Sequence, residues 1–101
     1  MANTYKTDMV SVTTTGSNVL VFIASGDLIV RDVMIFAKGG AATVSVLYDD
    51  RTTDDVVAKK SLTADETWRP FTTPIAMRNA HELKVNTTDT LTILITYVEF
   101  S

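Results

Sequence analysis

Apolar and polar residues alternate along much of the chain at a spacing of two, which is typical of half-buried β-strands. In residues 43–48, 83–85 and 90–100, one set of alternate positions is apolar while the other carries mainly Thr, Ser or Lys. No segment keeps apolar residues at helical spacing for three turns. The pattern therefore predicts an all-β chain.

Turn-forming residues interrupt these runs at intervals of roughly 8 to 12 residues. Between them we expect about eight strands, at residues 8–15, 18–24, 28–38, 41–48, 56–62, 67–72, 81–86 and 90–100. Pro74 to Met77 is expected as a short edge piece, because proline cannot donate to a β ladder. This spacing favours a single antiparallel β-sandwich, jelly-roll-like, over a sheet with helical crossovers.

The chain has 101 residues, enough for one domain and too few for two ordinary ones. Met1 to Asp8 lack a core pattern, so we expect an N-terminal arm at 1–8 and a sandwich domain at 9–101. These first residues also lack the features of a secretory signal. The longest apolar run, Val19 to Ala24, is too short to cross a bilayer, which takes about 20 residues as a helix. We expect a soluble protein made in a cytoplasm, without a membrane partner.

Some strands carry apolar side chains on both faces. Residues 18–24 are apolar throughout after Asn18, residues 28–38 nearly so, and the last strand adds Leu94, Val98 and Phe100 to its polar face. A two-sheet sandwich of this size hides only one face of each strand. A long loop or another subunit must therefore cover the second face. Because the chain has few loop residues, we favour a subunit.

Aromatic residues and arginine are enriched where protein interfaces bind most strongly. On that ground the candidate interface residues are Tyr5, Phe22, Trp68, Arg69 and Phe100. Trp68 fits equally well as a core residue that closes one end of the sandwich.

Net charge is −3 and the sequence pI is about 4.9, which argues against a nucleic-acid partner, since such proteins cluster Lys and Arg. The chain has no cysteine, which excludes disulfides, thiolate metal sites and a cysteine nucleophile. His81 is the single histidine, and "HELK" lacks the second histidine of a zinc helix. No GxSxG elbow is present. We expect no catalytic residues, no metal and no cofactor, and hence no enzyme.

The stretch "YDDRTTDD", Tyr48 to Asp55, is the strongest candidate for chemistry. A calcium loop of the EF-hand type needs oxygen ligands at alternate positions, followed by glycine and a distant glutamate. Here Arg51 and Thr53 occupy the alternate positions, and neither glycine nor glutamate follows. We interpret the stretch as a polar hairpin tip between Tyr48 and Val56 in which aspartates bond their own backbone. A calcium site between neighbouring loops stays open as the alternative. The pair Gly39-Gly40 is interpreted as a hairpin turn that needs positive φ.

Three longer segments carry a resemblance: "DLIVRDVMIFAKGGAATVSVLYDD", "KKSLTADETWRPFTTPIAM" and "HELKVNTTDTLTILITYVEF". Together with the preceding strand they span roughly Val19 to Phe100, and they resemble small tailed-bacteriophage virion proteins of the capsid decoration (cement) type. The resemblance implies a β-sandwich that forms a homotrimer and binds the major capsid protein on the outer surface of the head. It also implies a protein made in the host cytoplasm and located in the virion. A tail, neck or fibre component remains an alternative. So does a carbohydrate-binding module that uses Trp68, Tyr48 or Tyr5 as a platform.

Overall fold

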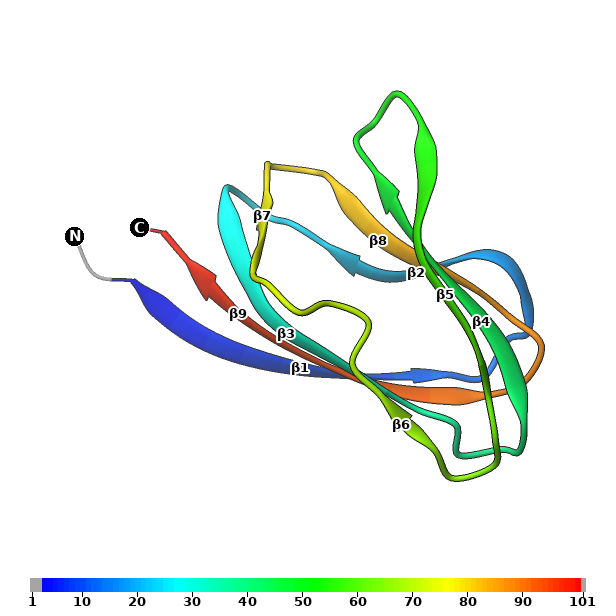
Figure 1. Ribbon diagram of the computed structural model, residues 1–101. Helices are drawn as coiled ribbons and strands as arrows, with labels where there is room; N and C mark the ends of the chain where they lie inside the picture. Colours follow the sequence, from blue (N-terminus) through cyan, green and yellow to red (C-terminus); the bar gives the residue numbers. More distant parts are fainter. Residues whose placement is uncertain (1–2, 101) are drawn as a thin grey trace.

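The computed structural model describes residues 3–100, which form nine strands in two antiparallel sheets (Figure 1). In chain order the strands are β1 (Thr4–Val12), β2 (Gly16–Ile23), β3 (Leu28–Phe36), β4 (Ala42–Asp49), β5 (Asp54–Leu62), β6 (Thr67–Trp68), β7 (Ile75–Met77), β8 (Glu82–Thr87) and β9 (Leu91–Glu99). The predicted all-β sandwich is confirmed. Across the same residues, no helix is long and apolar enough to span a membrane.

The chain passes repeatedly from one sheet to the other. Sheet A has the order β1-β9-β3-β6, with β7 also paired to β3, and sheet B has the order β2-β8-β4-β5. Consecutive strands lie in different sheets except for the pairs β4–β5 and β6–β7. This wrapping of alternate strands around a common interior is the jelly-roll topology that the turn spacing indicates.

The core lies between the sheets and follows the period-two pattern. Ile35, Ile95 and Leu91 of sheet A and Val44 of sheet B belong to this core, and none of the four has exposed surface. A bulge in β2 between Leu20 and Phe22 breaks the simple alternation there. As a consequence two consecutive residues of that strand, Val21 and Phe22, are both buried.

The first strand begins earlier than the pattern predicts. β1 pairs with β9 over its whole length, from Thr4 opposite Glu99 to Val12 opposite Leu91. The predicted arm is therefore not observed at residues 4–8, and Met1 and Ala2 lie outside the described residues. The side chains from Thr4 to Met9 are all exposed, because this edge of sheet A extends beyond sheet B (Figure 1). An edge strand exposed on both faces leaves no apolar alternation to detect.

The predicted strand at 67–72 is much shorter than expected, because only Thr67 and Trp68 form a strand, β6. β6 and β7 pair with opposite ends of β3 and are joined by a loop that contains Pro70 and Pro74. Proline has no N–H for the ladder, so pairing stops between them. The expected edge piece at 74–77 corresponds to β7.

Candidate functional site

The acidic stretch forms a short hairpin turn. Strands β4 and β5 continue to the turn itself, which occupies only residues 50–53, so the loop is shorter than the predicted seven-residue tip. One carboxylate oxygen of Asp50 accepts the N–H groups of Thr52 and Thr53, at 2.9 and 2.8 Å. These bonds lower the pKa of Asp50 and hold the turn closed. The interpretation that aspartates here bond their own backbone is confirmed.

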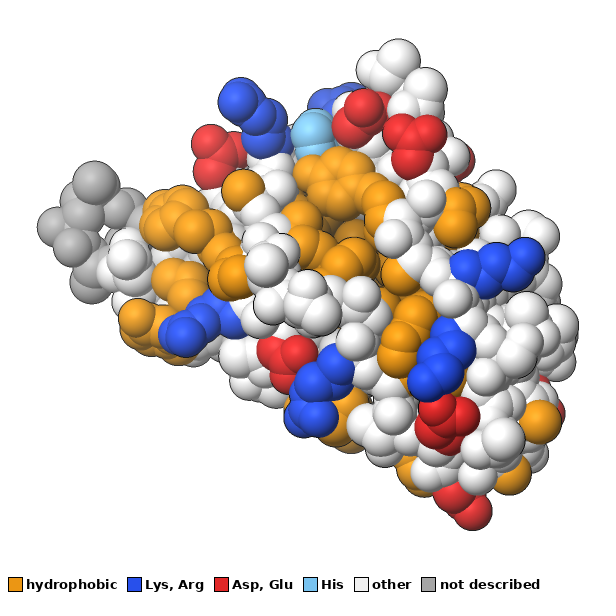
Figure 2. Space-filling view, in the orientation of Figure 1, with side chains coloured by type: hydrophobic (Ala, Val, Ile, Leu, Met, Phe, Trp, Pro, Cys, Tyr) orange, Lys and Arg blue, Asp and Glu red, His pale blue; other side chains and the backbone are white. Residues whose placement is uncertain are grey.

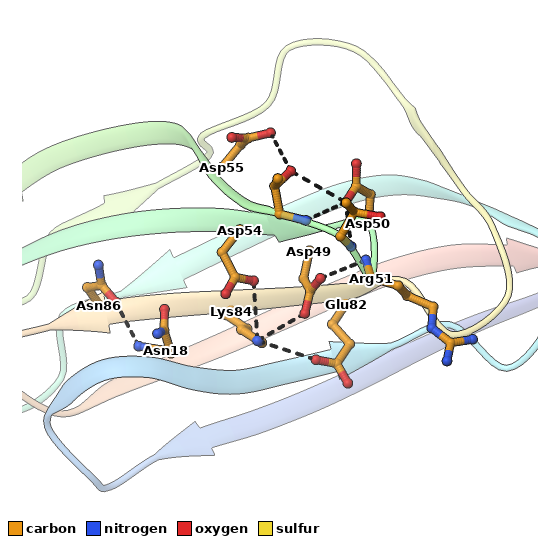
Figure 3. A network of polar contacts seen from close by, with 11 residues as sticks. Asn18, Asp49, Asp50, Arg51, Asp54, Asp55, Glu82, Lys84 and Asn86 are labelled. Carbon is orange, nitrogen blue, oxygen red and sulfur yellow. Dashed lines mark hydrogen bonds and ion pairs between the residues drawn. The ribbon is translucent and has the colours of Figure 1, made fainter.

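Lys84 is the centre of the remaining charges (Figure 3). It lies on the outward face of sheet B, and its ammonium is 3.0 Å from Asp49, 3.3 Å from Asp54 and 3.7 Å from Glu82. The lysine side chain is only 17% exposed. Three strands therefore bring three carboxylates to one cation, and we call these four residues the Lys84 cluster.

The contacts within the Lys84 cluster favour the charged forms of Asp49 and Lys84. The hydrogen bond from Lys84, followed by the Arg51 N–H, lowers the pKa of Asp49, and the bond with Asp49 raises the pKa of Lys84. Both groups therefore remain charged around neutral pH, whereas a general acid or base needs a pKa near the working pH. Beside the cluster is an open depression of about 330 Å³, lined by Asp49, Arg51, Thr52, Thr53, Asp54, Ala80 and Glu82.

A metal ion would compete with Lys84 for the same space. The ammonium already stands between the three carboxylates (Figure 3). Within residues 3–100, no group of three or more His, Cys, Asp or Glu side chains is placed to hold a metal ion.

His81 makes a structural contact. Its Nδ1 is 2.7 Å from the hydroxyl of Tyr48, and the two rings meet edge-on at 5.5 Å. Its carbonyl accepts the N–H of Ala24 at 2.9 Å, which ties the segment before β8 to the segment after β2. The imidazole is thus directed at a phenol, not at a serine or a carboxylate. Burial raises the pKa of Tyr48, so that hydroxyl stays protonated at neutral pH.

Three of the five predicted interface residues are exposed on one surface, the outward face of sheet A. Tyr5 is 66% and Phe100 50% exposed. The Arg69 side chain is 60% exposed and forms an ion pair with Asp32 at 3.1 Å. Phe100 follows β9 and has the same orientation as Val98, the residue opposite Tyr5.

The other two predicted interface residues face the interior. Phe22 is 7% exposed and its ring centre lies 4.9 Å from that of Tyr97, so this residue is part of the core of the sandwich and not of its exposed surface. The bulge in β2 turns it inward. Trp68 is half-buried on β6 and packs against the core, as the alternative for that residue anticipates. Of the three possible sugar platforms, Tyr5 alone has a largely exposed ring, since Tyr48 and Trp68 are both half-buried.

The outward face of sheet A carries the second apolar faces that the sequence predicts for residues 28–38 and for the last strand, whereas residues 18–24 lie in sheet B. We call this face of sheet A the outer face. Its apolar side chains form two rows across the strands β1, β9 and β3. The tyrosine row consists of Tyr5, Val98 and Ile29. The methionine row consists of Met9, Leu94 and Met34. Between the rows lie Thr7, Thr96 and Asp32.

The outer face is open to solvent along β1. Met9 is 71% and Tyr5 66% exposed, so no loop of the described chain covers these two side chains. Charged groups border the apolar rows, since the Arg31 guanidinium lies 5.8 Å from the Tyr5 ring centre and Arg69 pairs with Asp32. Figure 2 shows hydrophobic side chains gathered at the end of the molecule where the termini lie. An apolar surface with a charged border is the arrangement of a binding face.

The chain matches no protein-family model, no curated protein and no solved structure. The candidate site therefore rests on the geometry of this molecule.

Proposed function

We propose that this protein is a non-enzymatic structural component of a tailed-phage virion, a decoration protein that binds the outside of the head shell. The observation that carries the proposal is the outer face, whose apolar residues Tyr5 and Met9 remain largely exposed. Surfaces of this kind are usually covered by a partner. The sequence resemblance to decoration proteins suggests which partner, namely the major capsid protein.

The rigidity of the outer face supports a docking role. Its three long strands have nine residues each and are paired side by side, so the binding surface exists before the partner arrives. A preorganised surface loses little conformational entropy on binding. The ion pair of Arg69 with Asp32 adds polar groups between the two apolar rows, where they favour a single orientation.

Stabilisation of the shell would come from bridging. The resemblance implies a homotrimer, in which each copy contacts a different capsid subunit. Linked copies bind with greater avidity than one copy alone, so that individually weak contacts hold neighbouring capsid subunits together. Neither a cofactor nor nucleic acid takes part in this role.

The proposal is tested by adding the purified protein to head shells that lack it and measuring co-sedimentation. Leu94→Lys places a charge in the middle of the outer face and is expected to weaken shell binding about tenfold or more. Leu20→Lys is the matched control, because Leu20 lies exposed on the outward face of sheet B. This control should bind shells as the unchanged protein does.

Electron microscopy of the virion provides the second arm of the test. Many copies distributed over the head support the proposal, whereas copies found only at the tail or neck would replace it with the alternative role. Equal binding of shells by the two lysine variants would exclude the outer face as the docking surface.

A further inference from the structure

Three of the edges of the two sheets are protected against pairing with another chain. In sheet A, β6 and β7 have only two and three residues. In sheet B, the pairing of β2 shifts register twice, and the pairing of β5 shifts once. β5 also carries Lys59 and Lys60. Short strands, bulges and lysines are the usual means of preventing edge-to-edge association.

The remaining edge, β1, is neither short nor bulged, and its charged residues are Lys6 and Asp8. It has nine residues, contains neither glycine nor proline, and pairs with β9 without a register shift. One side of β1 is bonded to β9 and the other has no neighbour in the described chain. A long, regular edge strand presents a row of free N–H and C=O groups that another strand can bond.

We propose that a second copy of this chain pairs with β1 along this edge, antiparallel, about a two-fold axis that passes through Thr7. The sequence around this residue is complementary to itself when reversed. Lys6 then lies opposite Asp8 of the second copy, Tyr5 lies opposite Met9, and Thr7 lies opposite its own equivalent. Opposite charges, threonine pairs and aromatic–apolar pairs in directly facing positions all stabilise an antiparallel ladder.

The charges of Lys6 and Asp8 distinguish pairing about Thr7 from pairing about either adjacent residue. Facing residues of an antiparallel pair point to the same side of the sheet, whereas consecutive residues point to opposite sides. A two-fold axis perpendicular to the sheet that passed between two residues would make consecutive residues face each other, so the axis must pass through a residue. An axis through Lys6 places two lysines opposite each other, and an axis through Asp8 places two aspartates opposite each other. In-register parallel pairing opposes like charges at both positions. Centring on Thr7 is the arrangement that matches Lys6 with Asp8.

This pairing also extends the outer face. Because Met9 faces Tyr5 of the second copy, the methionine row of the first copy continues into the tyrosine row of the second. By symmetry, the tyrosine row of the first copy continues into the methionine row of the second. Two apolar rows would cross the combined sheet. The inference goes beyond the proposed function, since it holds whether or not the protein binds a shell. It predicts a two-fold pair in solution, which differs from the trimer that the resemblance implies.

A cysteine placed on the axis tests the register directly. The natural chain has no cysteine, so Thr7→Cys introduces a single thiol that would face its own equivalent. Facing residues of an antiparallel pair have Cα atoms about 4.5 to 5.5 Å apart, within the range of a disulfide. Ser11→Cys is the control, since its two thiols would be separated by eight residues, roughly 26 Å along the strands.

Mild oxidation of dilute protein should convert Thr7→Cys rapidly to a covalent dimer and leave Ser11→Cys monomeric. If the two variants cross-link at the same rate, the proposed register is wrong. This measurement needs no shell, so its failure leaves the proposed function untouched.

The mass in solution tests the pair without a cross-link. Sedimentation equilibrium of the unchanged protein should give twice the 11.1 kDa of one chain, and a monomer or a trimer would overturn the inference. Thr7→Lys opposes two ammonium groups on the axis and should weaken the dimer about tenfold or more. Ser61→Lys puts the same charge on the edge strand β5 and should leave the mass unchanged. Circular dichroism of both lysine variants verifies that they are folded.

Discussion

At the level of single residues, the buried polar side chains of the described chain form hydrogen bonds within the protein. Among the described residues, no buried side-chain nitrogen or oxygen lacks a hydrogen-bond partner. The acidic turn and the Lys84 cluster bring several carboxylates together, yet each of these carboxylates has a backbone or lysine partner. Such paired groups contribute to the stability of the fold.

Replacing Lys84 tests this interpretation. Lys84→Met leaves Asp49, Asp54 and Glu82 without their shared cation, so we expect a lower Tm and a pKa of Asp49 closer to its usual value. In the folded protein that pKa is depressed, so the stabilisation is present above the usual pKa of aspartate and is lost as the pH falls through the depressed value. The variant should therefore show a smaller acid-induced loss of stability.

Thermal unfolding and carbon-detected NMR titration of the carboxyl groups would measure both effects. Lys59→Met is the matched control, since Lys59 lies on the same sheet and is exposed. Unchanged titration of Asp49 in Lys84→Met would contradict the role of the cluster.

Tyr97 makes the protein sensitive to alkaline pH. Burial, together with the nearby charge of Asp8, raises the pKa of Tyr97 to about 12, and its hydroxyl donates to Asp8 at 3.2 Å. The folded state therefore holds this proton more tightly than the unfolded chain. The stabilisation is complete below the ordinary pKa of 10.0 and is lost as the pH rises toward about 12.

Tyr97→Phe should reduce the fall in unfolding free energy between about pH 10 and 12, as measured by urea denaturation over that range. Tyr5→Phe is the control, because Tyr5 is 66% exposed. An alkaline fall of the same size in the Tyr97 variant would exclude Tyr97 as its source.

At the level of elements, the two glycines between β3 and β4 have different roles. The prediction of a hairpin turn here is wrong, because β3 and β4 lie in different sheets. Gly40 has the predicted positive φ, 144°, but Gly39 is not in the positive-φ region. A Cβ on Gly39 would instead collide with the hydroxyl of Thr90 and approach an oxygen of Asp89 at 2.5 Å. Gly39 is therefore needed for close approach to the β8–β9 connection, and positive φ is needed only at Gly40.

Gly39→Ala should lower the free energy of unfolding by about 1 to 3 kcal/mol, because the added methyl group overpacks this contact. The Asp89 oxygen also accepts the N–H of Thr90 at 2.7 Å, which restrains it from moving aside. Urea denaturation measures the effect. In a Thr90→Ala background the same change should cost less, and an equal cost would refute the steric explanation.

At the level of the whole molecule, β1 completes sheet A rather than reaching away from it. Its first residues pair with the end of β9, and Lys6 forms an ion pair with Glu99 at 3.2 Å. The same strand supplies the exposed side of the outer face and its free edge. The stability of the sheet, the proposed docking and the proposed self-association therefore all depend on β1 being a paired strand.

Deleting residues 1–8 should lower the free energy of unfolding by about 2 kcal/mol or more, since several ladder hydrogen bonds are lost at roughly 0.5 to 1.5 kcal/mol each. Chemical denaturation of the truncated and complete chains would measure the difference. Equal stabilities would show that the first half of β1 contributes nothing to the fold and behaves as an arm after all.

The sequence by itself determined the fold class, the approximate positions of most strands and the existence of a second apolar surface. Alternation in strands such as β4, β8 and β9 is a local property, because each strand buries one face along its whole length. The sequence also identified Tyr5 and Phe100 as exposed aromatic residues. These features depend only on the order of residues along one segment.

Only the tertiary structure decided which strands share a sheet, and hence which residues meet. The register of β1 on β9, the inward turn of Phe22 and the position of Lys84 among carboxylates from neighbouring strands depend on pairing between segments far apart in the chain. A one-residue change of register would reverse which side chains face the solvent. That register is set by packing of the whole sandwich, and no single segment contains it.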